Sequence, residues 1–194
     1  RQEREQIRIF LEEHLSQSAV DPYLTLFDEF SKTIPEGNDE NAIRQLCEEI
    51  NPQLTQKQKI VIILELINII QADGIISDHE ENLLKRIGEN LKISEQEIEA
   101  IRIFVLGHLA EDLNHEQILI IDTSPTENFN RAKHMVRNYL NGFIAMLYVE
   151  QNDIYFIKYL GKTDVYLNGV PVKSGKISVL AVGSLLRWDK DDPV

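Results

Sequence analysis

The spacing of apolar residues changes once along the 194-residue chain, near residue 113, and this change constrains the fold more than any other feature. Before it, apolar residues recur every three or four positions, as on one face of an α-helix. After it, short runs rich in β-branched and aromatic residues alternate with turn residues. The sequence therefore predicts an α+β protein, with an all-α helical bundle over residues 1–113 and a small antiparallel β-sandwich over residues 114–194.

The helical part is predicted to consist of short helices that fold back on one another. Residues 56–71 are apolar nearly all round and should form the central helix. Helix starts are indicated by capping boxes, in which Ser or Thr is followed three residues later by Glu or Gln. Three pairs match: Thr55 with Gln58, Ser77 with Glu80, and Ser94 with Glu97. Because the links between these helices are short, successive helices should be antiparallel neighbours.

The second part is predicted to contain six strands separated by turns such as Asn168-Gly169 and Gly183-Ser184. The predicted strands are residues 118–121, 143–149, 154–159, 165–167, 177–182 and 185–188. Residues 127–141 fit either a short helix or a long loop, and the pattern alone does not decide between them. The last strand of this domain is expected to lie beyond Val194.

Charge is distributed unevenly between the two parts. The chain has a net charge of −12, and residues 1–113 hold 23 acidic and 11 basic residues, whereas residues 114–194 hold nine of each. This distribution argues against binding to nucleic acid or to anionic lipid, because both require clusters of Lys and Arg. No apolar run reaches the roughly 20 residues that span a bilayer, which argues against direct membrane insertion.

The ends of the chain and its single cysteine carry two further expectations. The sequence starts at Arg1 without a signal-type segment, so we expect it to be a segment of a longer protein. Cys47 lies on a predicted helical face, where a small buried side chain is the expected role.

The loop over residues 72–81 holds the candidate ligands for a metal ion, which are Asp73, Asp78 and Glu80. Part of this loop has the spacing of a calcium-binding EF-hand loop. The first and third ligand positions of such a loop would fall on Ile69 and Gln71, however, and this excludes an ordinary EF-hand site. A weak site for a divalent cation, Ca²⁺ or Mg²⁺, remains one interpretation.

The other interpretation of this loop is structural. Gly74 can adopt the positive φ that closes one helix, and Ser77 with Glu80 can cap the next helix. Both interpretations use Glu80, so the sequence leaves them open.

Residues 57–104 resemble the TerB-like (tellurite-resistance) helical domain. The resemblance rests on Ala72-Asp73-Gly74, the following Ser77 and Glu80, and the later Leu83-Leu84 and Ile93-Ser94. It covers about residues 20–105 and implies an acidic helical bundle that serves as an accessory module near membrane-linked or stress systems. In some members, divalent metal is associated with the positions matched here by Asp73 and Glu80.

Residues 117–188 resemble a forkhead-associated (FHA) domain, mainly through the run 153–172 with its Asn168-Gly169 turn. FHA domains bind phosphothreonine through loops carrying Arg, Ser and Asn, because a dianion needs a cation and several donors. Where the family has Ser-Arg-x-His this chain has Asn141-Gly142-Phe143-Ile144, and where it has Asn-Gly this chain has Thr163-Asp164. The resemblance therefore implies an FHA-like scaffold without phosphopeptide recognition.

No catalytic motif is evident. The phosphate-binding loops, the dinucleotide-binding fingerprint and the nucleophile elbow are absent from the sequence. The histidines have no metal-binding spacing and are expected at solvated positions: His14, His79, His108, His115 and His134. The aromatic side chains of the β part are expected to serve mainly in packing.

These patterns favour a non-catalytic docking or regulatory region of a larger cytoplasmic protein. Its partners would be another protein or other domains of the same polypeptide, with a homo-oligomer also open. By family resemblance, the missing neighbour is an ABC-type transport ATPase, whose domains would bring this region to the membrane. The alternative is a divalent-metal-sensing module that acts through the Asp73–Glu80 loop. A hydrolase using Asp73, Asp78 and Glu80 ranks last, because one loop supplies too few ligands.

Overall fold

The computed structural model describes residues 39–71, 76–125 and 129–188, together with Glu5, Arg8, Asp21 and Leu24. The chain divides into two compact units, Arg1–Ile98 and Glu99–Val194. The division falls inside a helix, before the change in apolar spacing near residue 113. Apart from those four single positions, residues 1–38 of the predicted helical bundle lie outside the described residues.

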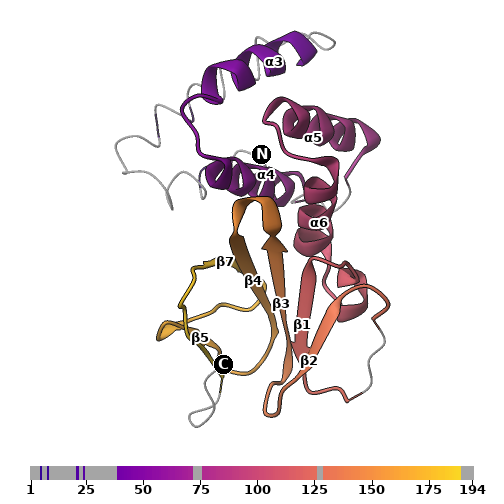
Figure 1. Ribbon diagram of the computed structural model, residues 1–194, viewed down its shortest axis with the longest axis vertical. Coiled ribbons are helices and arrows are strands. Elements are labelled where there is room, and N and C mark those ends of the chain that lie inside the picture. The colour runs from indigo at the N-terminus through magenta and orange to yellow at the C-terminus, as the bar shows by residue number, and fades with distance from the viewer. Residues whose placement is uncertain are drawn as a thin grey trace. The chain divides into compact units, whose positions relative to one another are not determined.

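In its described stretches from residue 39 onward, the first unit contains three complete helices and the start of a fourth (Figure 1). They are α3 (Asp39–Ile50), α4 (Gln56–Ile70), α5 (Asp78–Asn90) and α6 (Glu95–Leu106), and α6 passes into the second unit at residue 99. The bounds of α4 confirm the helix predicted for residues 56–71. Its buried positions include Ile60, Ile63, Leu64 and Ile67, and Cys47 of α3 is buried as expected. No helix in the described part of the chain has the length and apolar character needed to cross a membrane.

The predicted capping boxes are all present. Thr55 caps α4 and Ser77 caps α5, each with the reciprocal bond from the third helical residue. At the start of α6 the Ser94 backbone N–H donates to Glu97 Oε2 at 3.0 Å, and the Glu97 N–H donates to Ser94 Oγ at 3.2 Å. These bonds satisfy backbone donors that have no partner within the helix.

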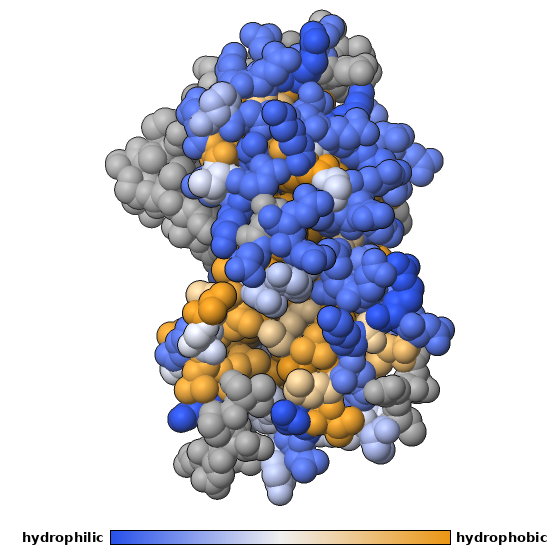
Figure 2. Space-filling view, in the orientation of Figure 1, coloured by the Kyte–Doolittle hydropathy of each residue, from blue (hydrophilic) through white to orange (hydrophobic). Residues whose placement is uncertain are grey.

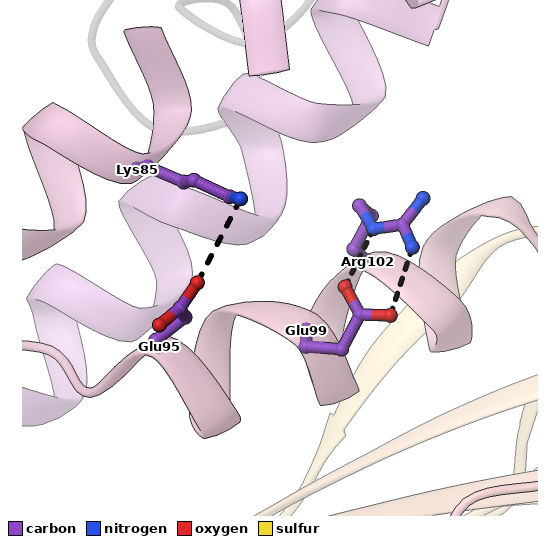
Figure 3. A network of polar contacts seen from close by, with 4 residues as sticks. All are labelled: Lys85, Glu95, Glu99 and Arg102. Atoms are coloured by element: carbon purple, nitrogen blue, oxygen red, sulfur yellow. Dashed lines mark hydrogen bonds and ion pairs between the residues drawn. The ribbon is translucent and has the colours of Figure 1, made fainter. Parts of the chain in front are cut away.

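Two side-chain hydrogen bonds and an ion pair join the helices of the first unit. The Asn51 side chain donates to the Asn90 carbonyl at 2.8 Å, and the Gln56 side chain donates to the Lys92 carbonyl at 2.8 Å. An exposed ion pair joins Lys85 to Glu95 at 3.7 Å (Figure 3). Exposed ion pairs of this kind contribute about 0–1 kcal/mol to stability. The two hydrogen bonds from side-chain amides to carbonyls at the end of α5 therefore matter more for holding the helices together.

The second unit is built on two sheets (Figure 1). The larger has the order β2-β1-β3-β4-β7, formed by β1 (Ile118–Asp122), β2 (Lys133–Val136), β3 (Gly142–Val149), β4 (Ile154–Gly161) and β7 (Ile177–Leu180). The smaller has the order β6-β5-β8, formed by β5 (Tyr166–Leu167), β6 (Val170–Pro171) and β8 (Leu186–Arg187). The described part of the unit also contains two short 3₁₀ helices, η2 (Ala110–Leu113) and η3 (Glu150–Asn152). The α+β class is confirmed, with a mostly antiparallel sheet after the helices.

The segment for which the sequence allowed a short helix or a long loop contains a strand instead. Strand β2 pairs with β1 in parallel, with Ile120 opposite His134. A parallel neighbour needs a connection that crosses over, and residues 123–132 supply it. With four residues and two intermediate positions, β2 has too weak an alternation to be recognised from sequence.

Both faces of the larger sheet are covered. One face packs on the smaller sheet, in a core that includes Ile121, Ile144, Ile157, Tyr159 and Trp188. On the opposite face η2 contacts β1 and β3, and buried side chains from the strands alternate with those of the first face. This second face contains Ile120, Leu147 and Phe156, all at most 1% exposed.

A lysine lies among these apolar side chains. Lys158 of β4 is 2% exposed, and its ammonium donates to the carbonyls of Phe104 at 2.5 Å, Val105 at 3.1 Å and Gly107 at 2.6 Å. These carbonyls belong to the end of α6, which has no basic residue in its own last turn. A cation there satisfies the last carbonyls and complements the helix dipole.

Burial lowers the pKa of Lys158 to about 8, and Asp112 acts in the opposite direction. Between pH 8 and the ordinary value of 10.5 the unfolded chain holds this proton and the folded chain does not, so the free energy of unfolding rises with pH there and is flat below. Replacing Lys158 leaves three carbonyls without their donor. We expect Lys158→Met to cost about 2–4 kcal/mol at pH 7, measured by urea unfolding.

The difference between wild type and Lys158→Met should then grow by up to about 2 kcal/mol between pH 8 and 9.5. Arg187→Met, at an exposed position of β8, is the matched control and should show no such change. A difference that stays constant over this range would show that the three carbonyls fully offset the cost of burying the charge.

Candidate functional site

The candidate metal-binding loop is described only from Ile76 onward, so Asp73 lies outside the described residues. Glu80 is committed to the helix cap: its Oε2 accepts from the Ser77 backbone N–H at 2.7 Å and from Ser77 Oγ at 2.6 Å. Bonds from the Ser77 side chain and backbone lower the pKa of the Glu80 carboxyl. Asp78 is exposed in the first turn of α5, where a negative charge is favourable next to the helix N-terminus.

The residues present do not make a complete site for a divalent cation. Among the described residues, no three His, Cys, Asp or Glu side chains are grouped closely enough to hold a metal ion. One oxygen of Glu80 is already bound by two donors, and a six- to eight-coordinate cation needs more ligands than Asp78 and Glu80 offer. The structural interpretation of Ser77 and Glu80 is thus observed, while a site that also uses Asp73 stays a prediction.

In the second unit, two loops lie side by side at the ends of β3 and β4. The Asn141 backbone N–H donates to Thr163 Oγ1 at 2.6 Å, and the Lys162 N–H donates to the Asn141 carbonyl at 2.9 Å. The buried Tyr159 hydroxyl donates to the same carbonyl at 3.0 Å and accepts from the Thr163 N–H. The polar groups of both loops therefore bond to each other.

Gly142 shows how closely the strands approach at this point. Its φ is +115°, and a Cβ there would overlap the Leu160 carbonyl oxygen. No side chain fits at this position without moving backbone. A shallow cavity of about 210 Å³ lies beside these loops, lined among others by Lys162, Asp164 and Ser174. A cation and an acid thus share its rim.

Among the histidines that the structure describes, His115 and His134 have buried side chains, so the expectation of solvated positions is wrong for both. His115 is 6% exposed, and its Nδ1 accepts from the Gln117 N–H at 3.2 Å. Burial lowers its pKa, Arg131 lowers it further, and Glu116 and Glu99 oppose this. His115 therefore stabilises the turn before β1 by accepting this hydrogen bond.

His134 is the second buried histidine. Its side chain is 2% exposed and its Nε2 lies 2.8 Å from Asp122 Oδ1, while Nδ1 is buried without a partner. Asp122 Oδ1 also accepts from the Ser124 N–H at 2.8 Å. The pair joins β2 to the end of β1, and the enclosed Nδ1 cannot reach a substrate.

Sequence reasoning missed Lys158, the most buried charged side chain of the second unit. A signal was present, because Lys158 follows Ile154 and Phe156 at alternate positions of a predicted strand. Such positions share one face of the sheet, so a lysine there indicates either an exposed face or a buried partner.

The family model for the tellurite resistance protein TerB matches residues 1–103. This is more than half of the chain. The chain belongs to the TerB family. The match confirms the TerB-like part of the resemblance seen in the sequence, and the TerB domain here is helical as that resemblance implied. No curated protein and no solved structure matches the chain.

We expect Ser77 and Glu80, in the loop over residues 72–81, to contribute to stability as the N-cap of α5. Ser77→Ala and Glu80→Ala should each lower the free energy of unfolding by about 1 kcal/mol, because each removes one side of the capping box. Ser94→Ala, at the equivalent cap of α6, provides the comparison. Urea unfolding measures all three.

The metal prediction is tested on the same variants. Calorimetric titration with Ca²⁺, Mg²⁺, Mn²⁺ and Zn²⁺ should give no saturable heat with wild type if the loop is only a cap. Saturable binding that is lost in Asp73→Ala and kept in Ser94→Ala would instead establish a metal site in this loop.

Proposed function

We propose that this chain is a non-catalytic docking and regulatory region of a larger protein, in which the TerB domain is followed by an FHA-like β-domain. The observation that carries the proposal is an apolar side chain held out on an ordered loop. Val182 is 84% exposed and lies between β7 and β8. Exposed apolar side chains that gather on one part of a surface are typical of regions that bind other proteins.

The loop that presents Val182 is fixed by Asn168. The Asn168 N–H donates to the Leu185 carbonyl at 2.8 Å, the Leu185 N–H donates to Asn168 Oδ1 at 2.8 Å, and the Asn168 side-chain amide donates to Ser184 Oγ at 3.2 Å. Asn168 has a φ of +52° and is followed by Gly169 at +82°, the turn geometry expected from Asn-Gly. Two further exposed apolar residues, Val170 and Leu185, flank this turn.

Figure 2 supports the contrast between the two units. Hydrophilic residues dominate the visible face of the helical unit, whereas apolar residues gather over the β unit. The largest exposed apolar fractions in β7, β6 and their loops are those of Val182, Val170 and Val179. The β-domain is therefore the part we propose to contact a partner.

The geometry of the loops supports an FHA-like domain without phosphopeptide recognition. In the FHA pattern an Arg would stand at Gly142, where a Cβ would overlap the Leu160 carbonyl. The Thr163 hydroxyl is occupied by the Asn141 N–H, and Asp164 would repel a phosphate. Docking through unmodified protein surface is the remaining use of this scaffold.

The finer proposal concerns the setting. By family resemblance we propose a cytoplasmic location and an ABC-type transport ATPase as the neighbouring domain or partner, and the likeness of the TerB module to accessory domains is its only support. Metal sensing through the Asp73–Glu80 loop is the alternative, and the titration described above decides it.

Site-specific photocrosslinking tests the docking proposal. A benzophenone amino acid at Val182 should crosslink to one discrete protein in cells, and the same group at Tyr139, which is 76% exposed, should not. The crosslinked protein, once purified, should bind wild type and bind Val182→Asp at least about tenfold more weakly. A partner with a nucleotide-binding domain would support the ABC-type setting.

Two results would count against this proposal. Equal crosslinking from Val182 and Tyr139 would indicate random collision, and a purified partner that binds Val182→Asp as tightly as wild type would remove the loop from the interface. A partner without a nucleotide-binding domain would overturn the ABC-type setting and leave docking intact.

A further inference from the structure

Strand β7 is the last strand of the larger sheet. It pairs with β4 on one side, with Phe156 opposite Val179, and in the described part of the chain no strand lies on its other side. In an antiparallel ladder every second residue directs its N–H and C=O away from its partner. The outer side of β7 therefore presents backbone donors and acceptors that can pair with another extended chain.

The two edges of this sheet differ in how they are protected. At the opposite edge β2 begins with the exposed Lys133, is followed by Arg137, and charges of this kind discourage pairing. Strand β7 has the sequence Ile-Ser-Val-Leu, with neither a charge nor a proline. Val179 in its middle is 51% exposed. Within the strands themselves, only β2 carries a protecting charge.

Basic residues gather at the start of β7. Lys173 is exposed in the loop that leads into the strand, and Lys176 immediately precedes it. Lys162 approaches from the end of β4, because the Gly161 N–H donates to Ser174 Oγ in the same loop at 3.2 Å. Asp164 is the acid beside them, lining the same cavity as Lys162. Among the described residues named here, Lys162 and Lys173 outnumber Asp164, so this end of the edge favours negative charge.

We propose that β7 binds an extended, acidic peptide segment of a partner protein, which adds to the sheet as a further strand. Backbone hydrogen bonds to the outer side of β7 hold the segment, an apolar residue covers Val179, and its acidic residues face Lys162 and Lys173. This inference rests on the proposed docking function and specifies the chemistry of the partner.

The probe is a fluorescein-labelled peptide of about eight residues in which valine alternates with glutamate, measured by fluorescence anisotropy on the whole chain. It should bind at least about tenfold more tightly than the same peptide with lysine in place of glutamate, and its affinity should fall as salt is raised. Peptides N-methylated at alternate residues separate backbone pairing from charge. One methylated set removes the donors that face β7 and should abolish binding, while the other set should keep it.

Variants of the chain locate the contact. Val179→Glu introduces an edge charge at a half-exposed position and should weaken binding about tenfold or more. Val136→Glu, at a 42% exposed position of the opposite edge, is the matched control and should change the affinity less than twofold. Lys173→Glu should weaken binding of the glutamate peptide and strengthen binding of the lysine peptide. Circular dichroism confirms that each variant is folded.

Several outcomes would overturn the inference. Equal binding of both N-methylated sets would exclude strand addition, and equal binding of the acidic and basic peptides would exclude the charge preference. A concentration-dependent dimer abolished by Val179→Glu would assign the edge to a second copy of the chain. The Val182 crosslink does not depend on strand pairing with β7. If the crosslink forms but none of the peptides binds, the strand-addition inference is wrong and the docking proposal stands.

Discussion

The ammonium of Lys158 and the three carbonyls at the end of α6 set the arrangement of the second unit. Strand β4 lies between β3 and β7, so a lysine at its centre can reach the helix end only if that end lies over one face of the sheet. Bringing a charge into the apolar face is costly without several acceptors, and the exposed carbonyls of a helix C-terminus supply them. The position of the C-terminal end of α6 over the sheet is then fixed by the Lys158 side chain.

The carbonyls at the end of α6 contact Lys158 on one face of the larger sheet, η2 contacts β1 and β3, and the smaller sheet packs on the other face, so a partner would bind elsewhere on the described β unit. What remains are the strand edges and the loops between strands. Val182, in the loop after β7, has the largest exposed fraction among the described apolar residues, and Val179 of β7 is half-exposed, while β2 contains Lys133 and is followed by Arg137. The location proposed for docking is thus a consequence of how the sheet is buried, and it would follow even if the FHA-like comparison were set aside.

The features that sequence predicted well are local ones. A capping box involves residues three positions apart, so Thr55, Ser77 and Ser94 could each be recognised without knowing the fold. The features it missed depend on residues far apart: β2 needs β1 as a parallel partner, and Lys158 needs carbonyls more than 50 positions away. For the candidate site the same rule holds. The hydrogen bond between Ser77 and Glu80 could be predicted from their spacing of three residues. The hydrogen bond between Asn141 and Thr163 could not, because it joins loops 22 positions apart.

Charge gives the proposed docking a direction. The acidic residues in excess belong to residues 1–113, while residues 114–194 are balanced and place Lys162 and Lys173 near β7. We expect the excess acid of residues 1–113 to repel an acidic segment, whereas Lys162 and Lys173 attract it to the start of β7. The same repulsion disfavours β7 pairing with extended acidic stretches of a second copy. An edge without protecting charges can therefore persist, because the acidic part of each molecule limits unwanted association.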